Sequence, residues 1–312
     1  MSKLYTASLC LQGHPSTSSA QNQQRAALLD MSCKLHDESS DNSISTFVLP
    51  GGTFWGNGAL FEMPPNERRQ VVQRSDWAQT VMNTIPHDMA VVTGLDITAP
   101  QEGEPHAQYS VYLTKKGVQA VSRKIFPTKG EIKQGAFVLS TDYADTSRIV
   151  RTSVTKNSVI MHTCYDLFGS VDVLSGKTKP TRLSHTAAPD DRSKMQCYQA
   201  FQGMLTGYDM TCDDLVTVNI HDFKQPGRDI FYQRHGIASA SAAFDGALVI
   251  GAAHFTSTLP ASRSQSPLSA VGVAKDHLTA RFHRQAHPYY AVSHSMIETN
   301  TQKGILRVFA PS

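Results

Sequence analysis

The first fifty or so residues alternate between two hydrophobic periodicities, and this alternation restricts the fold more than any other feature of the chain. Tyr5–Leu11 is a short apolar run typical of a buried strand, whereas Gln23–His36 carries apolar residues at helical spacing. Ile44–Leu49 is a second apolar run, which ends at Pro50-Gly51-Gly52. A strand, a helix and a strand in this order predict a crossover unit, in which helices pack against a sheet.

The remainder of the chain continues this alternation. Thr114–Gly117 is a turn signal between two short strands, at 109–113 and 118–122, and it predicts a hairpin. The other predicted elements are helices at 66–85, 193–205 and 230–244 and strands at 89–95, 135–140, 149–154, 157–163, 215–220, 247–253 and 305–309. We therefore expect a single α/β domain over residues 1–312, with an irregular insertion near 170–192 and a C-terminal extension from about 256.

Composition argues against several classes of protein. Hydrophobic residues make up 40% of the 312 residues and charged residues 18%, so a substantial core can form. The net charge of +3 is too small to indicate binding to nucleic acid or to an anionic membrane. No apolar stretch reaches the length of a membrane span. The apolar run that follows Lys3 lacks the small-residue cleavage site of a signal peptide.

The five cysteines indicate a reducing compartment, and we expect a cytoplasmic protein. Their odd number and the absence of a Cys-x-x-Cys pair are not typical of a disulfide framework or a structural zinc site. His283 and His287 are four residues apart, but Pro288 and the nearby arginines favour a surface patch over a metal site. We therefore expect no metal and no cofactor.

One cysteine stands at the end of a predicted strand. Asn157–Gly169 begins as a β-branched apolar run and ends at Cys164-Tyr165-Asp166, where an α/β protein would present a nucleophile. The alternative is a buried structural cysteine, because a free thiol packs as a small hydrophobic group. His162 lies two positions earlier, on the same strand face. It is either a base for the thiol or a hydrogen-bonded core residue.

Three motifs follow one another along the chain. A strand ending in Val48-Leu49-Pro50-Gly51 precedes Arg123-Lys124-Ile125-Phe126 and then Cys164-Tyr165-Asp166. In type and order they resemble the nitrilase (carbon–nitrogen hydrolase) superfamily. The resemblance extends from the first strand to about Phe255 and is strongest over Lys124–Phe168. It implies a single nitrilase-like α-β-β-α sandwich, with two sheets face to face and helices outside, that associates as a homodimer or larger homo-oligomer.

The resemblance also implies roles for four residues. Cys164 is then the nucleophile that attacks an amide or nitrile carbon, and Lys124 is the cation that stabilises the developing negative charge. The backbone N–H of Tyr165 would be an oxyanion donor, and Glu131 a second carboxylate between the lysine and the cysteine. The alternatives are a solvated lysine at a hairpin end for Lys124 and a surface charge for Glu131.

The chain differs from the family at the position of the catalytic base. The family carries its catalytic glutamate where this chain has Gly51, and glycine has no side chain to accept a proton. Glu62, further along the same loop, and Glu131 are the two candidate substitutes. Phe168 is followed by Gly169-Ser170, where the family commonly has an arginine and a proline-glutamate pair, which indicates a remodelled pocket rim.

Two functions follow from these residues. The first is a carbon–nitrogen hydrolase of the amidase type, with a thiol nucleophile, acting on a small amide or nitrile without a cofactor. The second, motivated by Gly51, is a catalytically degenerate nitrilase-like protein that binds a ligand or a protein partner. The two differ in whether any group at the site can take the proton of Cys164.

Overall fold

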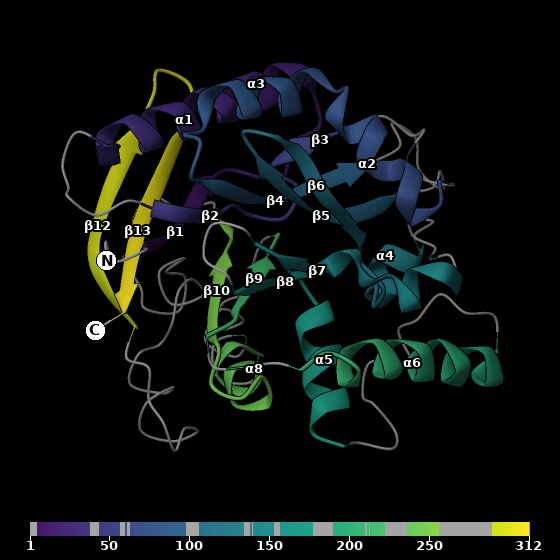
Figure 1. Cartoon of the computed structure of the whole chain (residues 1–312). Coiled ribbons are helices and arrows are strands. Elements are labelled where there is room, and N and C mark those ends of the chain that lie inside the picture. Colours follow the sequence, from purple (N-terminus) through teal and green to yellow (C-terminus); the bar gives the residue numbers. More distant parts are fainter. Residues whose placement is uncertain are drawn as a thin grey trace.

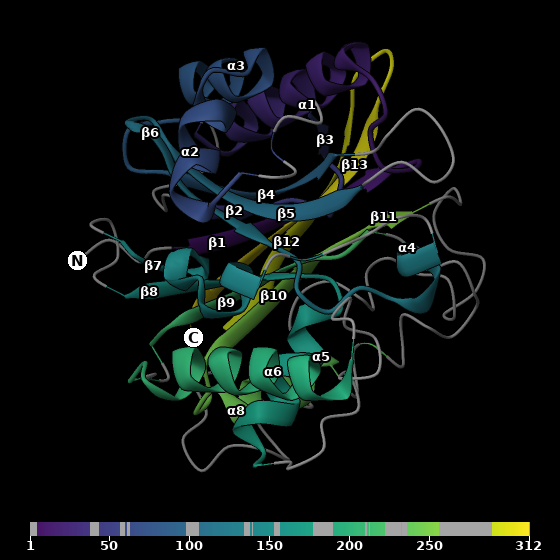
Figure 2. The same ribbon diagram turned by 90° about the vertical axis from the view of Figure 1, so that its right-hand side faces the viewer.

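Two β-sheets lie face to face in the computed structural model of the chain, and helices cover the outer face of each sheet (Figures 1 and 2). The structure describes residues 5–311 with the exception of 38–43, 57–59, 61–62, 98–105, 134–137, 139, 153–156, 177–189, 210, 212, 222–231, 233–235 and 256–288. The four layers form the α-β-β-α sandwich predicted from the sequence.

The larger sheet combines the N-terminal part of the chain with the C-terminal hairpin. In spatial order its strands are β12 (Tyr289–Glu298), β13 (Lys303–Pro311), β1 (Tyr5–Gln12), β2 (Ile44–Val48), β4 (Ala90–Ile97), β5 (Ala107–Thr114) and β6 (Gly117–Arg123). Two short strands join it: β3 (Phe54–Trp55) pairs with β4, and β11 (His254–Phe255) pairs with β1. β1, β2 and β4 are parallel, whereas β13 and β5 run antiparallel to their neighbours β1 and β4.

The smaller sheet carries the predicted nucleophile strand. In spatial order its strands are β10 (Leu248–Ala252), β9 (Leu215–Asn219), β8 (Ser158–Thr163) and β7 (Ile149–Arg151). β10, β9 and β8 are parallel, and β7 is antiparallel to β8. Residues that follow β8 and β9 therefore emerge at the same edge of this sheet, which is where parallel strands place functional groups.

Among the described residues, helices cover the outer face of each sheet (Figure 1). The larger sheet is covered by α1 (Ser19–Asp37), α2 (Pro65–Gln73) and α3 (Asp76–Thr84), and the smaller sheet by α5 (Asp166–Leu174), α6 (Asp191–Thr206) and α8 (Ala238–Ala243). The short helix α4 (Lys129–Lys133) and the 3-10 turns η2 (Ser140–Ala144) and η3 (Thr146–Arg148) connect β6 to β7.

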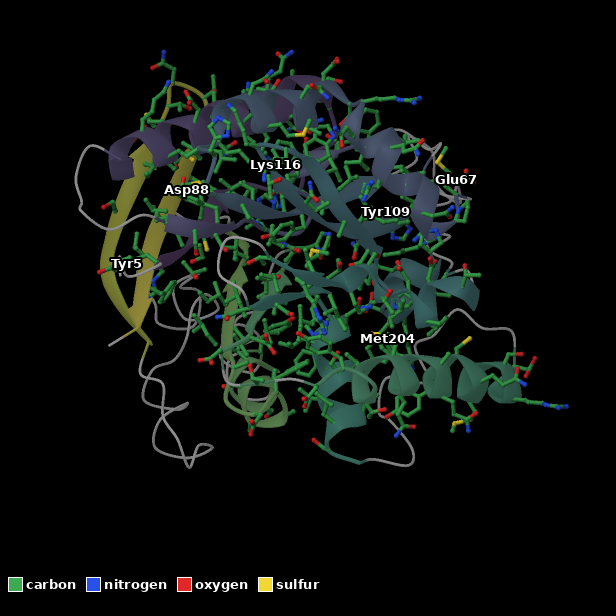
Figure 3. All side chains as sticks on the ribbon, in the orientation of Figure 1. Tyr5, Glu67, Asp88, Tyr109, Lys116 and Met204 are labelled. Carbon is green, nitrogen blue, oxygen red and sulfur yellow. The ribbon has the colours of Figure 1, made fainter. Side chains whose placement is uncertain are left out.

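Side chains fill the space between all four layers (Figure 3). Apolar side chains such as Val48, Val92, Met161 and Ile250 make the contacts between the two sheets, and all four are fully buried. Burial of each such side chain contributes about 1.5–3 kcal/mol relative to exposure. These buried contacts therefore favour one relative position of the two sheets.

The predicted helix at 66–85 is two helices, because the chain turns at Ser75. This residue is extended (φ −73°, ψ 143°) between α2 and α3. Its hydroxyl donates to the Val72 carbonyl (2.7 Å) at the end of α2. Asp76 then begins α3 with an acidic side chain in the first turn, which favours a new helix start. The sequence prediction of one continuous helix was therefore wrong.

Two further predictions need correction or completion. Residues 170–192 were predicted to be irregular, but α5 continues to Leu174 and α6 begins at Asp191, whereas 177–189 lie outside the described residues. The segment from about 256 contributes β12 and β13, so the predicted strand at 305–309 is confirmed and forms part of the larger sheet. His283 and His287 lie outside the described residues.

The remaining general features concern membranes and thiols. Within the described ranges, every helix is too short or too polar to cross a bilayer. Cys10, Cys33, Cys164 and Cys197 are free thiols, and Cys212 is outside the described part of the chain. Burial raises the pKa of the Cys10 thiol to about 12, so this cysteine is an inert core residue.

Candidate active site

The carboxyl ends of β2, β8 and β9 meet where the two sheets come together. The N–H of Gly51, which follows β2, donates to the Ile220 carbonyl at 3.0 Å. The N–H of Cys164, which follows β8, donates to the Asn219 carbonyl at 3.0 Å. His221 comes directly after these two acceptors, so backbone hydrogen bonds hold Gly51, Cys164 and His221 beside one another.

A buried polar network lies beneath this junction. The Asn219 side chain donates to the Leu49 carbonyl (2.7 Å) and accepts from the Ser110 hydroxyl (2.6 Å). The hydroxyls of Ser110 and Thr163 are 2.7 Å apart. Because an unsatisfied buried polar group costs free energy, this network favours one relative position of the two sheets directly under the site.

Cys164 occupies a strained turn between β8 and α5. Its φ of 49° lies in the left-handed region, which costs a non-glycine residue about 1–2 kcal/mol. The turn is held from both sides, because the Cys164 carbonyl also accepts a hydrogen bond from the Tyr232 hydroxyl. The side chain is half-buried. A nucleophile on a strained strand-to-helix turn projects its side chain away from the strand, which supports a functional rather than a purely structural thiol.

Lys124, at the end of β6, is buried with 4% of its surface exposed, so the solvated-lysine alternative is wrong. Its ammonium donates to Glu131 Oε1 (2.7 Å) and to Gln108 Oε1 (2.8 Å). Burial opposes the charged form, but electrostatic attraction to Glu131 and Cys164 outweighs burial and raises the pKa of Lys124. The structure therefore holds a buried cation near enough to Cys164 for the two groups to interact electrostatically.

Glu131 lies on α4 and binds the ammonium group of Lys124. Only 16% of its side chain is exposed, so the surface-charge alternative is also wrong. Its second oxygen, Oε2, accepts from the N–H of Thr128 (2.5 Å). Burial raises its pKa, but the Lys124 charge and these hydrogen bonds outweigh burial and lower the pKa of Glu131 to about 2. Such a carboxylate is a weak proton acceptor, and it holds the ammonium in place.

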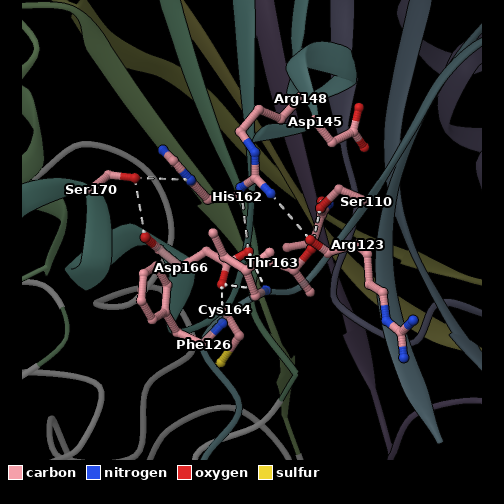
Figure 4. Close-up of polar contacts among 12 residues, drawn as sticks. Ser110, Arg123, Phe126, Asp145, Arg148, His162, Thr163, Cys164, Asp166 and Ser170 are labelled. Atoms are coloured by element: carbon pink, nitrogen blue, oxygen red, sulfur yellow. Dashed lines mark hydrogen bonds and ion pairs between the residues drawn. The ribbon is translucent and has the colours of Figure 1, made fainter. Parts of the chain in front are cut away.

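Asp166, in the first turn of α5, connects the cysteine turn to the lysine strand (Figure 4). Its Oδ1 accepts from the N–H groups of Ile125 (3.1 Å) and Phe126 (3.0 Å), the two residues that follow Lys124. Burial raises the pKa of Asp166, and the guanidinium of Arg148 lies 3.6 Å from its Oδ2. The carboxylate therefore positions Lys124 relative to Cys164.

His162 is a core residue, as one of the two sequence interpretations held. It is fully buried, with its ring 5.6 Å from the Phe244 ring and its Nδ1 3.5 Å from the Ser170 hydroxyl. Figure 4 shows it directed toward Ser170 and away from the sulfur of Cys164. Burial lowers the pKa of His162 to about 3, so it stays neutral.

A histidine–aspartate pair completes the site, and sequence reasoning missed it. Nε2 of His221, which follows β9, lies 2.8 Å from Oδ1 of Asp96, near the end of β4, and both side chains are buried. The Cys164 side chain also acts on the charge of His221, although Nδ1 of the ring makes no hydrogen bond of normal geometry to a described residue. Burial opposes protonation, but Asp96 and Cys164 outweigh it and raise the pKa of His221 to about 10.

The histidine ring fills the space beside Gly51. A β-carbon on Gly51 would lie 2.4 Å from Nδ1 and 2.5 Å from Cε1 of His221. A β-carbon on Gly52 would lie 2.6 Å from Oδ2 of Asp96. The two glycines at the end of β2 therefore make room for the two members of the pair. The sequence signal was a histidine directly after a predicted strand, together with the missing glutamate.

The charge of His221 makes the stability effect of Asp96 depend on pH. Because the folded pKa of about 10 lies above the unfolded value of 6.5, this stabilisation is complete below pH 6.5 and is lost as the pH rises through 10. We expect Asp96→Asn to lower the free energy of unfolding most at pH 6 and least near pH 10.5, measured by urea denaturation at both values. A difference that is the same at both values would contradict the ion pair.

The remaining predicted site residues stay predictions. The Tyr165 ring centroid lies 6.0 Å from Lys124 Nζ and 5.4 Å from the Phe168 ring centroid, while the role of the Tyr165 N–H as an oxyanion donor is untested. Glu62 lies outside the described residues. Over the described ranges, no group of histidine, cysteine, aspartate or glutamate side chains has an arrangement that could hold a metal ion.

No family model and no curated protein matches the chain. It is similar to solved structures of an amidase from Nesterenkonia sp. AN1. A variant with acrylamide added to its active-site cysteine is 12% identical, over 81% of this chain and 79% of that chain, with a TM-score of 0.47. A second variant, described as belonging to the nitrilase superfamily, is 12% identical, over 81% and 78%, with a TM-score of 0.47. At this similarity the roles of the residues rest on the geometry of the site.

Proposed function

We propose that the chain is a thiol-dependent hydrolase that cleaves the carbon–nitrogen bond of a small amide or nitrile, with Cys164 as the nucleophile. One observation carries this proposal: the half-buried Cys164 thiol sits on a strained turn, and Asp166, two residues later, binds the backbone directly after the buried cation Lys124. A structural cysteine needs neither the strain nor the charge. Strain and charge of this kind are typical of nucleophilic sites.

The chemistry follows from the charges. Attack of the sulfur on a carbonyl carbon places negative charge on the carbonyl oxygen, and the Lys124 ammonium is a fixed donor for that charge. Glu131 keeps the ammonium oriented through its 2.7 Å contact. Because Lys124 is buried, its attraction to the oxyanion is screened less than it would be in water.

Covalent trapping tests this proposal directly. With a small amide as substrate, we expect mass spectrometry to detect an acyl group on Cys164 and an assay to detect released ammonia. Cys164→Ala should lose turnover by about 10⁴-fold or more, because the nucleophile is removed. Cys197→Ala is the matched control, since Cys197 is also a half-buried free thiol. It lies on α6 and should keep wild-type turnover.

The same experiment distinguishes the alternative function. A panel of amides and nitriles that gives neither an adduct on Cys164 nor turnover would contradict the hydrolase. It would favour a nitrilase-like protein that binds a ligand or a protein partner without catalysis, the interpretation that Gly51 motivates.

A further inference from the structure

The thiol needs a proton acceptor, and the described carboxylates that flank it are already committed. Both oxygens of Glu131 are bonded, to Lys124 and to the Thr128 N–H, and its pKa is lowered to about 2. Oδ1 of Asp166 is bonded to two backbone N–H groups. Gly51 has no side chain at all. The mechanism above therefore lacks a base unless another group supplies one.

His221 stands where a side chain at position 51 would otherwise project. The hypothetical Gly51 β-carbon falls 2.4 Å from Nδ1 of the ring, which is closer than real contacts allow. A side chain at 51 and the imidazole at 221 therefore exclude each other. The absence of a side chain at position 51 and the presence of the histidine ring beside it therefore depend on each other.

Asp96 fixes the orientation of the His221 ring. Its 2.8 Å contact with Nε2 leaves Nδ1 as the nitrogen available for proton transfer. Nδ1 has no partner of normal hydrogen-bond geometry among the described residues, while the His221 side chain still interacts with Cys164. Catalytic hydrogen bonds are often long before the substrate binds and tighten in the complex.

The charged and titratable groups around the ring are few. Asp96 and Cys164 interact with it most strongly, and the charge of His221 also acts on Glu131 and on His254. Burial lowers the pKa of His254 well below the ordinary value, so it is a neutral neighbour. The anionic groups around His221 thus favour the imidazolium that forms when it accepts a proton.

We propose that His221, oriented by Asp96, is the general base and general acid of this site, so that Cys164, His221 and Asp96 act as a catalytic triad in place of a glutamate at position 51. This inference rests on the proposed hydrolase function. The order thiol, imidazole and carboxylate is the arrangement by which a weak nucleophile is activated in unrelated folds.

The steps balance with the groups present. Before the substrate binds, Nδ1 of His221 already holds the proton of Cys164, so the sulfur attacks as a thiolate and bonds to the amide carbon. The imidazolium gives that proton to the nitrogen as the carbon–nitrogen bond breaks, so a neutral amine leaves and the acyl group remains on sulfur. Nδ1 then takes a proton from water as the water oxygen bonds to the acyl carbon. The carbon–sulfur bond breaks, the thiolate and the imidazolium are restored, and the carboxylic acid leaves.

Alkylation of Cys164 by iodoacetamide, followed by mass spectrometry between pH 5 and pH 10, tests the proton acceptor without requiring turnover. His221→Asn should slow alkylation at pH 6.5 by about tenfold or more and move the profile to higher pH, because the thiolate loses its imidazolium partner. It should also lower amide turnover by about 10²–10⁴-fold. His87→Asn, an exposed histidine between α3 and β4, is the control and should change neither.

Each outcome has a defined meaning. If the wild type hydrolyses amides and His221→Asn leaves both alkylation and turnover unchanged, the triad is wrong and the hydrolase stands. If the wild type hydrolyses nothing, the alkylation profile still decides whether His221 holds the proton of Cys164. If His221→Asn fails to fold, NMR titration of wild-type His221 replaces it. Alkylation of Cys164 should then lower the His221 pKa, and an unchanged value would overturn the triad.

Discussion

Replacing Gly51 with glutamate is expected to lower turnover strongly, although glutamate is the residue that the nitrilase superfamily uses as its base. The new β-carbon alone would meet Nδ1 of His221 at 2.4 Å and the Asn219 carbonyl oxygen at 2.9 Å. The ring must therefore move, and its 2.8 Å contact with Asp96 is lost. The incoming carboxylate would also lie in the same buried region as Asp96, where two like charges are unfavourable.

The expected loss in kcat/KM is about 10²–10⁴-fold, the usual effect of removing a general base. Gly51→Ala should cause a loss of the same order, because the clash comes from the β-carbon and not from the charge. Gly203→Ala is the control. A β-carbon there meets nothing within 4 Å, and an alanine within α6 should preserve activity and slightly stabilise the protein.

A double variant measures the coupling between the side chain at position 51 and the ring of His221. Combining Gly51→Glu with His221→Ala removes the ring that the glutamate would displace, so the pair should retain more activity than Gly51→Glu alone. Such non-additivity is expected for residues in direct contact. If Gly51→Glu alone raised turnover above the wild-type value, the wild type would lack only a base, and the degenerate ligand-binding protein would be favoured.

Local sequence patterns predicted those parts of the molecule that depend on neighbours in the chain. The strand before Cys164 and the hairpin before Lys124 are continuous stretches whose apolar spacing predicts them directly, and the structure confirms both. The break at Ser75 was missed although it is local, because its extended conformation does not interrupt the apolar spacing that the prediction used. Periodicity thus predicts that an element exists better than where it ends.

The histidine–aspartate pair could not be predicted in this way. His221 and Asp96 are 125 residues apart and lie at the ends of strands of two different sheets. They meet only because buried contacts between the sheets bring the ends of β4 and β9 to one junction. Lys124 and Glu131 are 7 residues apart, so one loop and one helix start suffice to join them. Sequence reasoning therefore named Lys124 and Glu131, which the structure brings together, but did not name His221 and Asp96.

Replacing Asp142 with asparagine is expected to cause a large loss of stability, because this carboxylate is shared by two buried guanidinium groups. Asp142, in the turn η2, lies 2.6 Å from the guanidinium of Arg68 on α2 and 3.5 Å from that of Arg123 on β6. All three side chains are at most 1% exposed. The Tyr109 ring lies between the layers near both guanidinium groups, 5.5 Å from Arg68 and 5.8 Å from Arg123.

The expected cost is about 3–5 kcal/mol in the free energy of unfolding, because two buried guanidinium groups lose their shared negative charge. Burial already lowers the pKa of Arg123, which shows that its charge is held at some cost. Arg123 directly precedes Lys124, so a shift of this cluster should also reduce turnover, although less than the loss of His221. Urea denaturation at neutral pH measures the change in the free energy of unfolding independently of any change in turnover.

Glu298→Gln is the matched control, because it removes one carboxylate from an ion pair of similar length in an exposed position. Lys303 Nζ lies 2.6 Å from Glu298 Oε1, but the two side chains are 46% and 56% exposed. Water screens such a pair, so its loss should cost less than about 1 kcal/mol. Equal costs for the two variants would mean that burial does not strengthen the Asp142 cluster. A larger cost for Asp142→Asn would show that burial strengthens the ion pairs that Asp142 makes with Arg68 and Arg123.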